Sequence, residues 1–94
     1  MLSIAIVEDS PKDRNALERH IQRYQKETQQ EIQLNSFDQA EIFLDRYRAV
    51  WDVVFMDIML PGMDGMTAAG KLRKLDSEVA LIFVNSLGNE FSES

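Results

Sequence analysis

Cysteine is absent from this 94-residue chain, and proline, glycine and basic residues are few. Without thiols, neither a disulfide framework nor a thiolate metal site can form. With two prolines and four glycines, the chain has no tract of the kind that makes linkers or low-complexity segments. Ten Lys and Arg against sixteen Asp and Glu leave a net charge of −6, whereas a nucleic-acid interface needs clustered basic side chains. We therefore expect no binding of DNA by this chain alone.

Long hydrophobic runs are absent as well. The longest spans about six residues, far below the roughly 20 that cross a bilayer. The N-terminal residues also lack the basic segment and apolar region of a secretory signal. We expect no membrane segment and a cytoplasmic location. The 45% hydrophobic content is typical of one small globular domain, here over residues 1–94.

Three apolar runs and one segment of alternating apolar and polar residues, expected to be a half-exposed edge strand, are separated by three segments of helical periodicity. Strands are expected at 2–7, 32–37, 52–57 and 79–84. The expected inward side chains are Leu17, Ile21, Tyr24 and Thr28 in the first helix, Ala40, Phe43, Leu44 and Tyr47 in the second, and Ala68, Ala69, Leu72 and Leu75 in the third. This order indicates a parallel sheet with right-handed crossovers and helices on both faces.

Residue types at the expected helix starts match the preferences for helix caps. Ser10 can cap the first helix, and Pro11 suits its first position. Asp38 with Glu41 three residues later resembles a capping box for the second helix. Asp64 suits the N-cap of the third.

Acidic residues close two of the apolar runs. Glu8 and Asp9 follow the first strand, and Asp57 ends the third. If these strands are neighbours, about 4.8 Å apart, three carboxylates converge at the edge where open parallel sheets bind ligands. Such carboxylates repel one another and need protonation or a cation. An acidic pair after a strand can also be only a helix cap, but the placement of Asp57 opposite the pair favours a functional cluster.

A hard divalent cation would relieve this repulsion. Mg²⁺ tolerates few protein ligands because it keeps several waters. With the metal bound, one carboxylate can attack a phosphoryl group while the metal neutralises the charge on the equatorial oxygens. We therefore expect Mg²⁺ as the cofactor and phosphoryl transfer to an aspartate.

Two stretches of the chain resemble the receiver domain of two-component response regulators. They are Ile-Val-Glu-Asp at 6–9 and Phe-Met-Asp-Ile-Met-Leu-Pro-Gly-Met-Asp-Gly at 55–65. The resemblance covers nearly the whole chain and implies a flavodoxin-like (CheY-like), doubly wound parallel sheet of strand order 2-1-3-4. The run at 81–84 also resembles the fourth strand of receivers that precede LytTR-type DNA-binding domains.

The resemblance implies a role for each matching residue. Asp57 would be the phosphoacceptor, Asp9 a direct Mg²⁺ ligand, and Glu8 a second acidic partner that acts largely through water. Met59 would bind the metal through its backbone carbonyl, and Gly65 would let the following helix approach closely. The implied partners are a sensor histidine kinase and an output domain or protein, expected to act in transcription. Such a domain catalyses at most its own phosphorylation and dephosphorylation.

Two features depart from the family pattern. Receivers usually carry Thr or Ser after the fourth strand, whereas this chain has Asn85, followed by Ser86. An amide can donate a hydrogen bond to a phosphoryl oxygen but is bulkier than a hydroxyl, so we expect slow phosphorylation and weak switching. Receivers also carry a Lys after a fifth strand, where it pairs with the phosphoryl oxygens. The sequence given ends before that strand, and Lys12 in the first helix is a poor substitute for this Lys.

The fourth strand is expected to be apolar on both faces and yet to lie at the edge of the sheet. Such an edge exposes backbone donors and acceptors and invites pairing with another chain. We expect a receiver domain that is incomplete at its C-terminus and lacks the last helix, strand and helix. Either the natural protein continues past Ser94, or this edge is covered by a homodimer or by domain swapping.

Two other functions compete with that of a phosphoacceptor. The first is a receiver-like module that is not phosphorylated and acts through dimerisation or protein binding. Mg²⁺ binding with acyl phosphate formation distinguishes it from a working receiver. The second is a free-standing hydrolase built on the carboxylates, which the lack of a second catalytic group disfavours.

Overall fold

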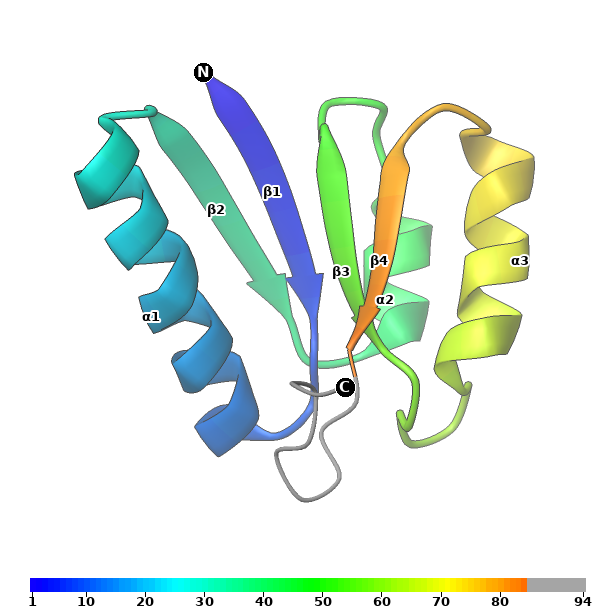
Figure 1. Ribbon diagram of the computed structural model, residues 1–94. Helices are drawn as coiled ribbons and strands as arrows, with labels where there is room; N and C mark the ends of the chain where they lie inside the picture. Colours follow the sequence, from blue (N-terminus) through cyan, green and yellow to red (C-terminus); the bar gives the residue numbers. More distant parts are fainter. Residues whose placement is uncertain (85–94) are drawn as a thin grey trace.

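The structure, a computed structural model, describes residues 1–84. Its strands are β1 (Leu2–Val7), β2 (Ile32–Phe37), β3 (Val53–Asp57) and β4 (Ala80–Val84), and its helices are α1 (Pro11–Thr28), α2 (Ala40–Asp45) and α3 (Gly65–Leu75). The strands form one parallel sheet in the order β2-β1-β3-β4 (Figure 1). The predicted flavodoxin-like, doubly wound architecture and its strand order are confirmed. None of these three helices is long and apolar enough to cross a membrane.

The sheet separates two apolar layers. On one face, α2 and α3 cover the main core through side chains such as Phe43 and Leu72. On the other face, Ile21 of α1 packs against Ile4 and Ile6 of β1. Because β1 is central and covered on both faces, its C-terminal end delivers the residues that follow it to the middle of the sheet edge.

The buried line of α1 differs in part from the predicted one. Leu17 and Ile21 face the sheet as expected, but the next inward position is Gln25, which is half-buried. Tyr24 is 53% exposed, and Thr28 is exposed as well, so the prediction for these two side chains is wrong. The buried line advances four residues at a time, whereas the predicted stripe took a step of three.

The last turn of α3 departs from prediction for the same reason. Ala68 and Leu72 are fully buried as expected, but the line continues to Asp76, whose carboxylate accepts a hydrogen bond of 2.6 Å from the Tyr47 hydroxyl. Leu75, predicted to face inward, is 56% exposed. Its apolar side chain therefore lies on the outer surface.

Two of the three predicted helix caps are present. The Ser10 hydroxyl accepts a hydrogen bond from the Asp13 N–H at 3.3 Å, at the start of α1. The Asp64 carboxylate accepts one from the Thr67 N–H at 2.8 Å, at the start of α3. This hydrogen bond lowers the pKa of the Asp64 carboxyl group.

The predicted capping box of the second helix is wrong. The N-cap of α2 is Gln39, one residue later than expected, and its side chain makes no capping hydrogen bond. Asp38 therefore lies outside the capping position. Glu41 takes another role, because its carboxylate lies against Gly62 in the turn that follows β3.

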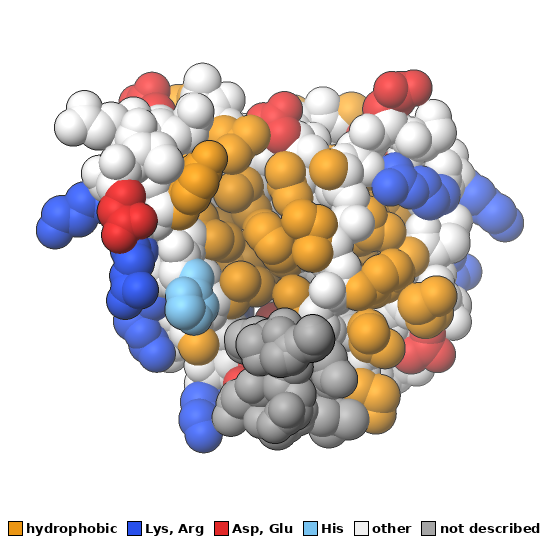
Figure 2. Space-filling model, viewed as in Figure 1, with side chains coloured by type: hydrophobic (Ala, Val, Ile, Leu, Met, Phe, Trp, Pro, Cys, Tyr) orange, Lys and Arg blue, Asp and Glu red, His pale blue; other side chains and the backbone are white. Residues whose placement is uncertain are grey.

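The prediction for the fourth strand is correct in part. Within residues 1–84, β4 is an edge strand, as expected. It is not buried on both faces, because Ile82 is 45% exposed and Phe83 37% exposed. Figure 2 shows hydrophobic side chains gathered over the sheet beside α1, on the face that this helix covers only in part.

Candidate functional site

Three carboxylates meet at the C-terminal edge of the sheet. The parallel register pairs Val7 with Met56, so the residues that follow them, Glu8 and Asp57, are neighbours across two strands. Asp9 joins them, and one carboxylate oxygen from each of the three residues lies within 4.8 Å of the others. The structure thus brings together the acidic residues that the sequence analysis singled out.

Burial divides the three carboxylates. Asp57 is fully buried and Glu8 is 2% exposed, whereas Asp9 is exposed. Burial raises the pKa of the Glu8 carboxyl group from 4.5 to about 8, against the opposing effect of the Ser10 N–H, which donates to it at 3.1 Å. A side-chain hydrogen bond with Asp57 and the negative charge of Asp57 raise the pKa of Glu8 further. Without a cation, burial and the neighbouring Asp57 therefore favour the protonated form of Glu8.

Backbone groups orient the buried aspartate. The Met59 N–H donates a hydrogen bond of 3.1 Å to Oδ1 of Asp57, and the Ile58 N–H donates one of 3.1 Å to the Val84 carbonyl. These two bonds hold the end of β3 against β4 and against the start of the following turn. Hydrogen bonds from backbone N–H groups therefore fix the position of Asp57.

Two glycines shape the turn between β3 and α3. Gly62 has a φ of 78°, in the left-handed region where a side chain is strained. A Cβ on Gly65 would stand 2.3 Å from the Asp57 carbonyl oxygen, so only glycine permits this approach of α3 to β3. The close approach expected at Gly65 is confirmed.

A residue of α1 that was not predicted from the sequence also supports the cluster. Nη1 of Arg14 donates a hydrogen bond of 3.0 Å to the Glu8 carbonyl oxygen and so holds the end of β1. Arg14 stands four residues after the Ser10 cap, on the inward side of the first turn. Helical spacing counted from the cap would have pointed to it.

The remaining residues considered for the site are Asn85, Ser86, Lys12 and Met59. Asn85 and Ser86 lie outside the described residues. Lys12 is exposed, and none of the contacts within residues 1–84 joins it to the carboxylates. The Met59 side chain is 55% exposed, so its proximity to Asp57 is made through the backbone.

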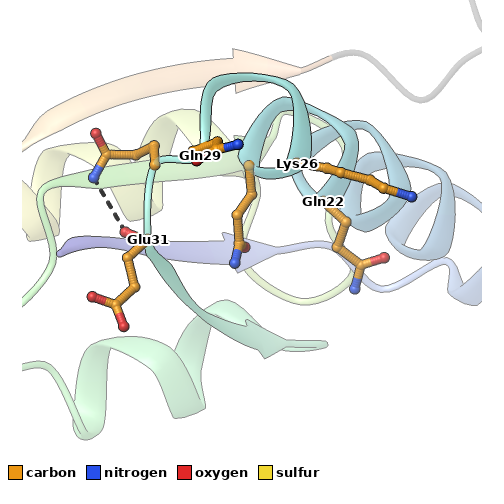
Figure 3. Close-up of a pocket in the computed structure, with 6 residues that line it drawn as sticks. Gln22, Lys26, Gln29 and Glu31 are labelled. Carbon is orange, nitrogen blue, oxygen red and sulfur yellow. Dashed lines mark hydrogen bonds between the residues drawn. The ribbon is translucent and has the colours of Figure 1, made fainter.

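A separate hollow lies at the other end of α1, away from the carboxylates. Its volume is about 710 Å³, and its lining is polar, with Gln22, Lys26, Gln29 and Glu31 among the side chains (Figure 3). Because α1 runs back along the sheet from the carboxylate edge, this hollow lies beside the start of β2 and takes no part in the site.

The chemistry of the cluster matches a hard divalent cation. All three side chains offer oxygen, two are withdrawn from solvent, and together they gather more negative charge than a buried site tolerates alone. Oxygen donors and partial hydration are the preferences of Mg²⁺. The residues present therefore fit a magnesium ion.

Known proteins are similar to this chain both in sequence and in fold. Chemotaxis protein CheY of Treponema pallidum is 36% identical over 50 residues, which make up 50% of this chain and 35% of the relative. The response regulator TrrA of Thermotoga maritima, solved in complex with Mg(2+)-BeF, superposes with a TM-score of 0.79 at 25% identity, covering 94% of this chain and 72% of TrrA. A second structure, of histidine kinase ThkA in complex with TrrA, gives a TM-score of 0.77 at 24% identity, with 99% of this chain and 76% of the matched chain covered.

The match to a family model extends over most of the sequence. The model of the response regulator receiver domain matches residues 4–93. This span includes both acidic stretches, most of β1, and all of β2, β3 and β4. The chain therefore belongs to the response regulator receiver domain family.

Proposed function

We propose that this receiver domain accepts a phosphoryl group on Asp57 from a sensor histidine kinase, with Mg²⁺ bound beside it, and relays the change to an output partner. The observation that carries the proposal is the cluster of Glu8, Asp9 and Asp57, whose carboxylate oxygens lie within 4.8 Å of one another. A buried nucleophile with two further acidic groups beside it suits phosphoryl transfer assisted by a metal.

The proposed metal ligands come from the ends of β1 and β3. Asp9 and Asp57 would bind Mg²⁺ directly, Glu8 largely through water, and Met59 through its backbone carbonyl. When bound, Mg²⁺ supplies positive charge that offsets the negative charge of the transferring phosphoryl oxygens. Asp9 is exposed whereas Glu8 and Asp57 are buried, so the phosphodonor would approach Asp57 from the side of Asp9.

The proposed transfer makes one bond and breaks another. A carboxylate oxygen of Asp57 attacks the phosphorus atom of a phosphohistidine on the kinase, forming a P–O bond as the P–N bond breaks. The imidazole leaves with the bonding electron pair and takes up a proton. The product is an acyl phosphate on Asp57. The hydrogen bond from the Met59 N–H to Oδ1 restrains the carboxylate during this attack.

Properties of similar proteins support the kinase and the metal. TrrA has been solved with Mg(2+)-BeF and also in complex with the histidine kinase ThkA, and this chain superposes closely on TrrA. The fold of this chain places an acidic cluster of its own at the C-terminal edge of the sheet. We infer the same classes of cofactor and partner for this chain.

Intact mass spectrometry after incubation with Mg²⁺ and acetyl phosphate tests the proposal. We expect a single phosphoryl adduct on the parent chain, slow to form because Asn85 replaces the usual hydroxyl. The adduct should be absent from Asp57→Asn and from parent treated with a chelator. Asp52→Asn is the matched control, since Asp52 is exposed and directly precedes the opposite end of the same strand. A folded parent without any adduct would overturn the proposal in favour of a module that is not phosphorylated.

A further inference from the structure

A groove of about 500 Å³ runs between α2 and α3, on the face of the sheet opposite α1. Leu44, Met63 and Leu75 line its apolar part. Leu44 and Met63 pack partly against the core, whereas Leu75 is 56% exposed. Leu75 therefore adds exposed apolar surface to the border of the groove.

The two walls of this groove carry opposite charge. The charged side chains that line the groove are Glu41 and Asp45 on α2 and Lys71 and Lys74 on α3, and all four are exposed. Within residues 1–84, none of these four side chains forms an ion pair or a hydrogen bond. The charges are therefore available to a partner that presents the opposite pattern.

A second copy of the chain presents that opposite pattern. Both helices follow parallel strands and return along the sheet, so α2 and α3 run in the same direction. A two-fold axis along the groove would lay α2 of one copy over α3 of the other, acidic wall against basic wall. A two-fold axis across the groove would instead oppose like charges. We propose that the α2–α3 groove is the interface of a symmetric dimer whose axis lies along the groove.

Charge also distinguishes this surface from the rest of the molecule. The chain carries a net charge of −6, so two copies repel each other in most orientations. The groove has two acidic and two basic side chains, so it meets its own copy without net repulsion. Its apolar side chains would then contact their counterparts across the axis. The proposal concerns exposed groups only and does not depend on phosphoryl transfer to Asp57.

Sedimentation velocity of the whole chain, compared between the parent and charge-reversal variants, tests this dimer. We expect the parent to dimerise between about 10 µM and 1 mM, the range suited to an interface of small area. Glu41→Lys with Asp45→Lys should weaken self-association at least about tenfold, and so should Lys71→Glu with Lys74→Glu, because each variant opposes like charges. Mixing the two variants should restore a dimer, since every pair across the axis is then of opposite sign.

The control is a variant with the same change in charge on a distant surface. Glu27→Lys with Glu31→Lys alters exposed side chains at the far end of α1 and the start of β2, and should dimerise at least as well as the parent. A parent that stays monomeric over this range would overturn the proposal. So would dimers that persist in both reversal variants, which would place the contact elsewhere, such as on the free edge of β4. A mixture that stays monomeric would contradict the cross-paired geometry.

Discussion

The α-carbon of Gly65 faces the carbonyl oxygen of Asp57 so closely that a Cβ there would stand 2.3 Å from this oxygen and 2.8 Å from the α-carbon of Ile58. Both atoms belong to the backbone, which cannot move aside as a flexible side chain could. Gly65→Ala should therefore lower the free energy of unfolding by about 1 to 3 kcal/mol and shift the carboxylate of Asp57. Urea denaturation measures the first effect, and Mg²⁺ titration the second.

Gly70 provides the matched control for this substitution. It lies within the same helix, but a Cβ there would meet nothing within 4 Å. Gly70→Ala should raise stability by about 0.5 to 1 kcal/mol, because alanine favours the helix over glycine. Equal effects of the two substitutions would show that the approach of α3 to β3 is not constrained by space.

A hydrogen bond ties the segment after α2 to the end of α3. The Tyr47 hydroxyl donates to Oδ2 of Asp76 at 2.6 Å, and this bond lowers the pKa of the Asp76 carboxyl group. Tyr47→Phe should cost about 1 kcal/mol in the free energy of unfolding, measured in urea. Tyr24→Phe should cost nothing, since the Tyr24 side chain is 53% exposed and makes no side-chain hydrogen bond within residues 1–84. A comparable loss in both variants would refute this role of Tyr47.

The effect of Mg²⁺ on stability should depend on pH through Glu8. The pKa of this carboxyl group is about 8 in the folded chain, against an ordinary value of 4.5. Between these two pH values, the folded state retains a proton that the unfolded state loses. Stability without metal should therefore fall as pH rises through that window. Mg²⁺ needs the ionised cluster and competes with the proton, so its stabilising effect should grow over the same range. Thermal unfolding at about pH 6 and pH 8.5, with and without Mg²⁺, checks this.

Replacing the titrating group should remove most of that dependence. Glu8→Gln keeps the size of the side chain and can still accept the Ser10 N–H, but it has no proton to lose. In this variant, stability without metal should change little with pH between about 5 and 8, and the Mg²⁺ effect should be small at both pH values. If the variant kept the pH dependence of the parent, the buried proton would have to be assigned to another group.

Sequence patterns predicted the sheet well because a central parallel strand leaves a continuous apolar run. β1 and β3 are such strands, and the acidic residues that follow them mark the edge where the cluster forms. The Ser10 and Asp64 caps were also visible, since both residue types stand directly before a helical segment. Local chemistry decides these features, so the sequence is enough to find them.

Features set by packing between elements were harder to predict. Leu75 has the right residue type for a core, but the buried line of α3 continues to Asp76, which Tyr47 satisfies by a hydrogen bond. The sequence placed Glu8 and Asp57 together without showing that both are buried, and so gave no sign of the raised pKa of Glu8. These outcomes depend on contacts with residues far away in the chain.

Locating the phosphoryl group at the level of a single residue tests most directly whether Asp57 is the phosphoacceptor. After transfer from a phosphorylated histidine kinase, borohydride reduction converts an aspartyl phosphate to homoserine, which tandem mass spectrometry can place in the sequence. We predict homoserine at position 57 alone, formed only when Mg²⁺ is present. Homoserine at Asp9, or none at all in a folded chain, would contradict the assignment of Asp57 as the phosphoacceptor.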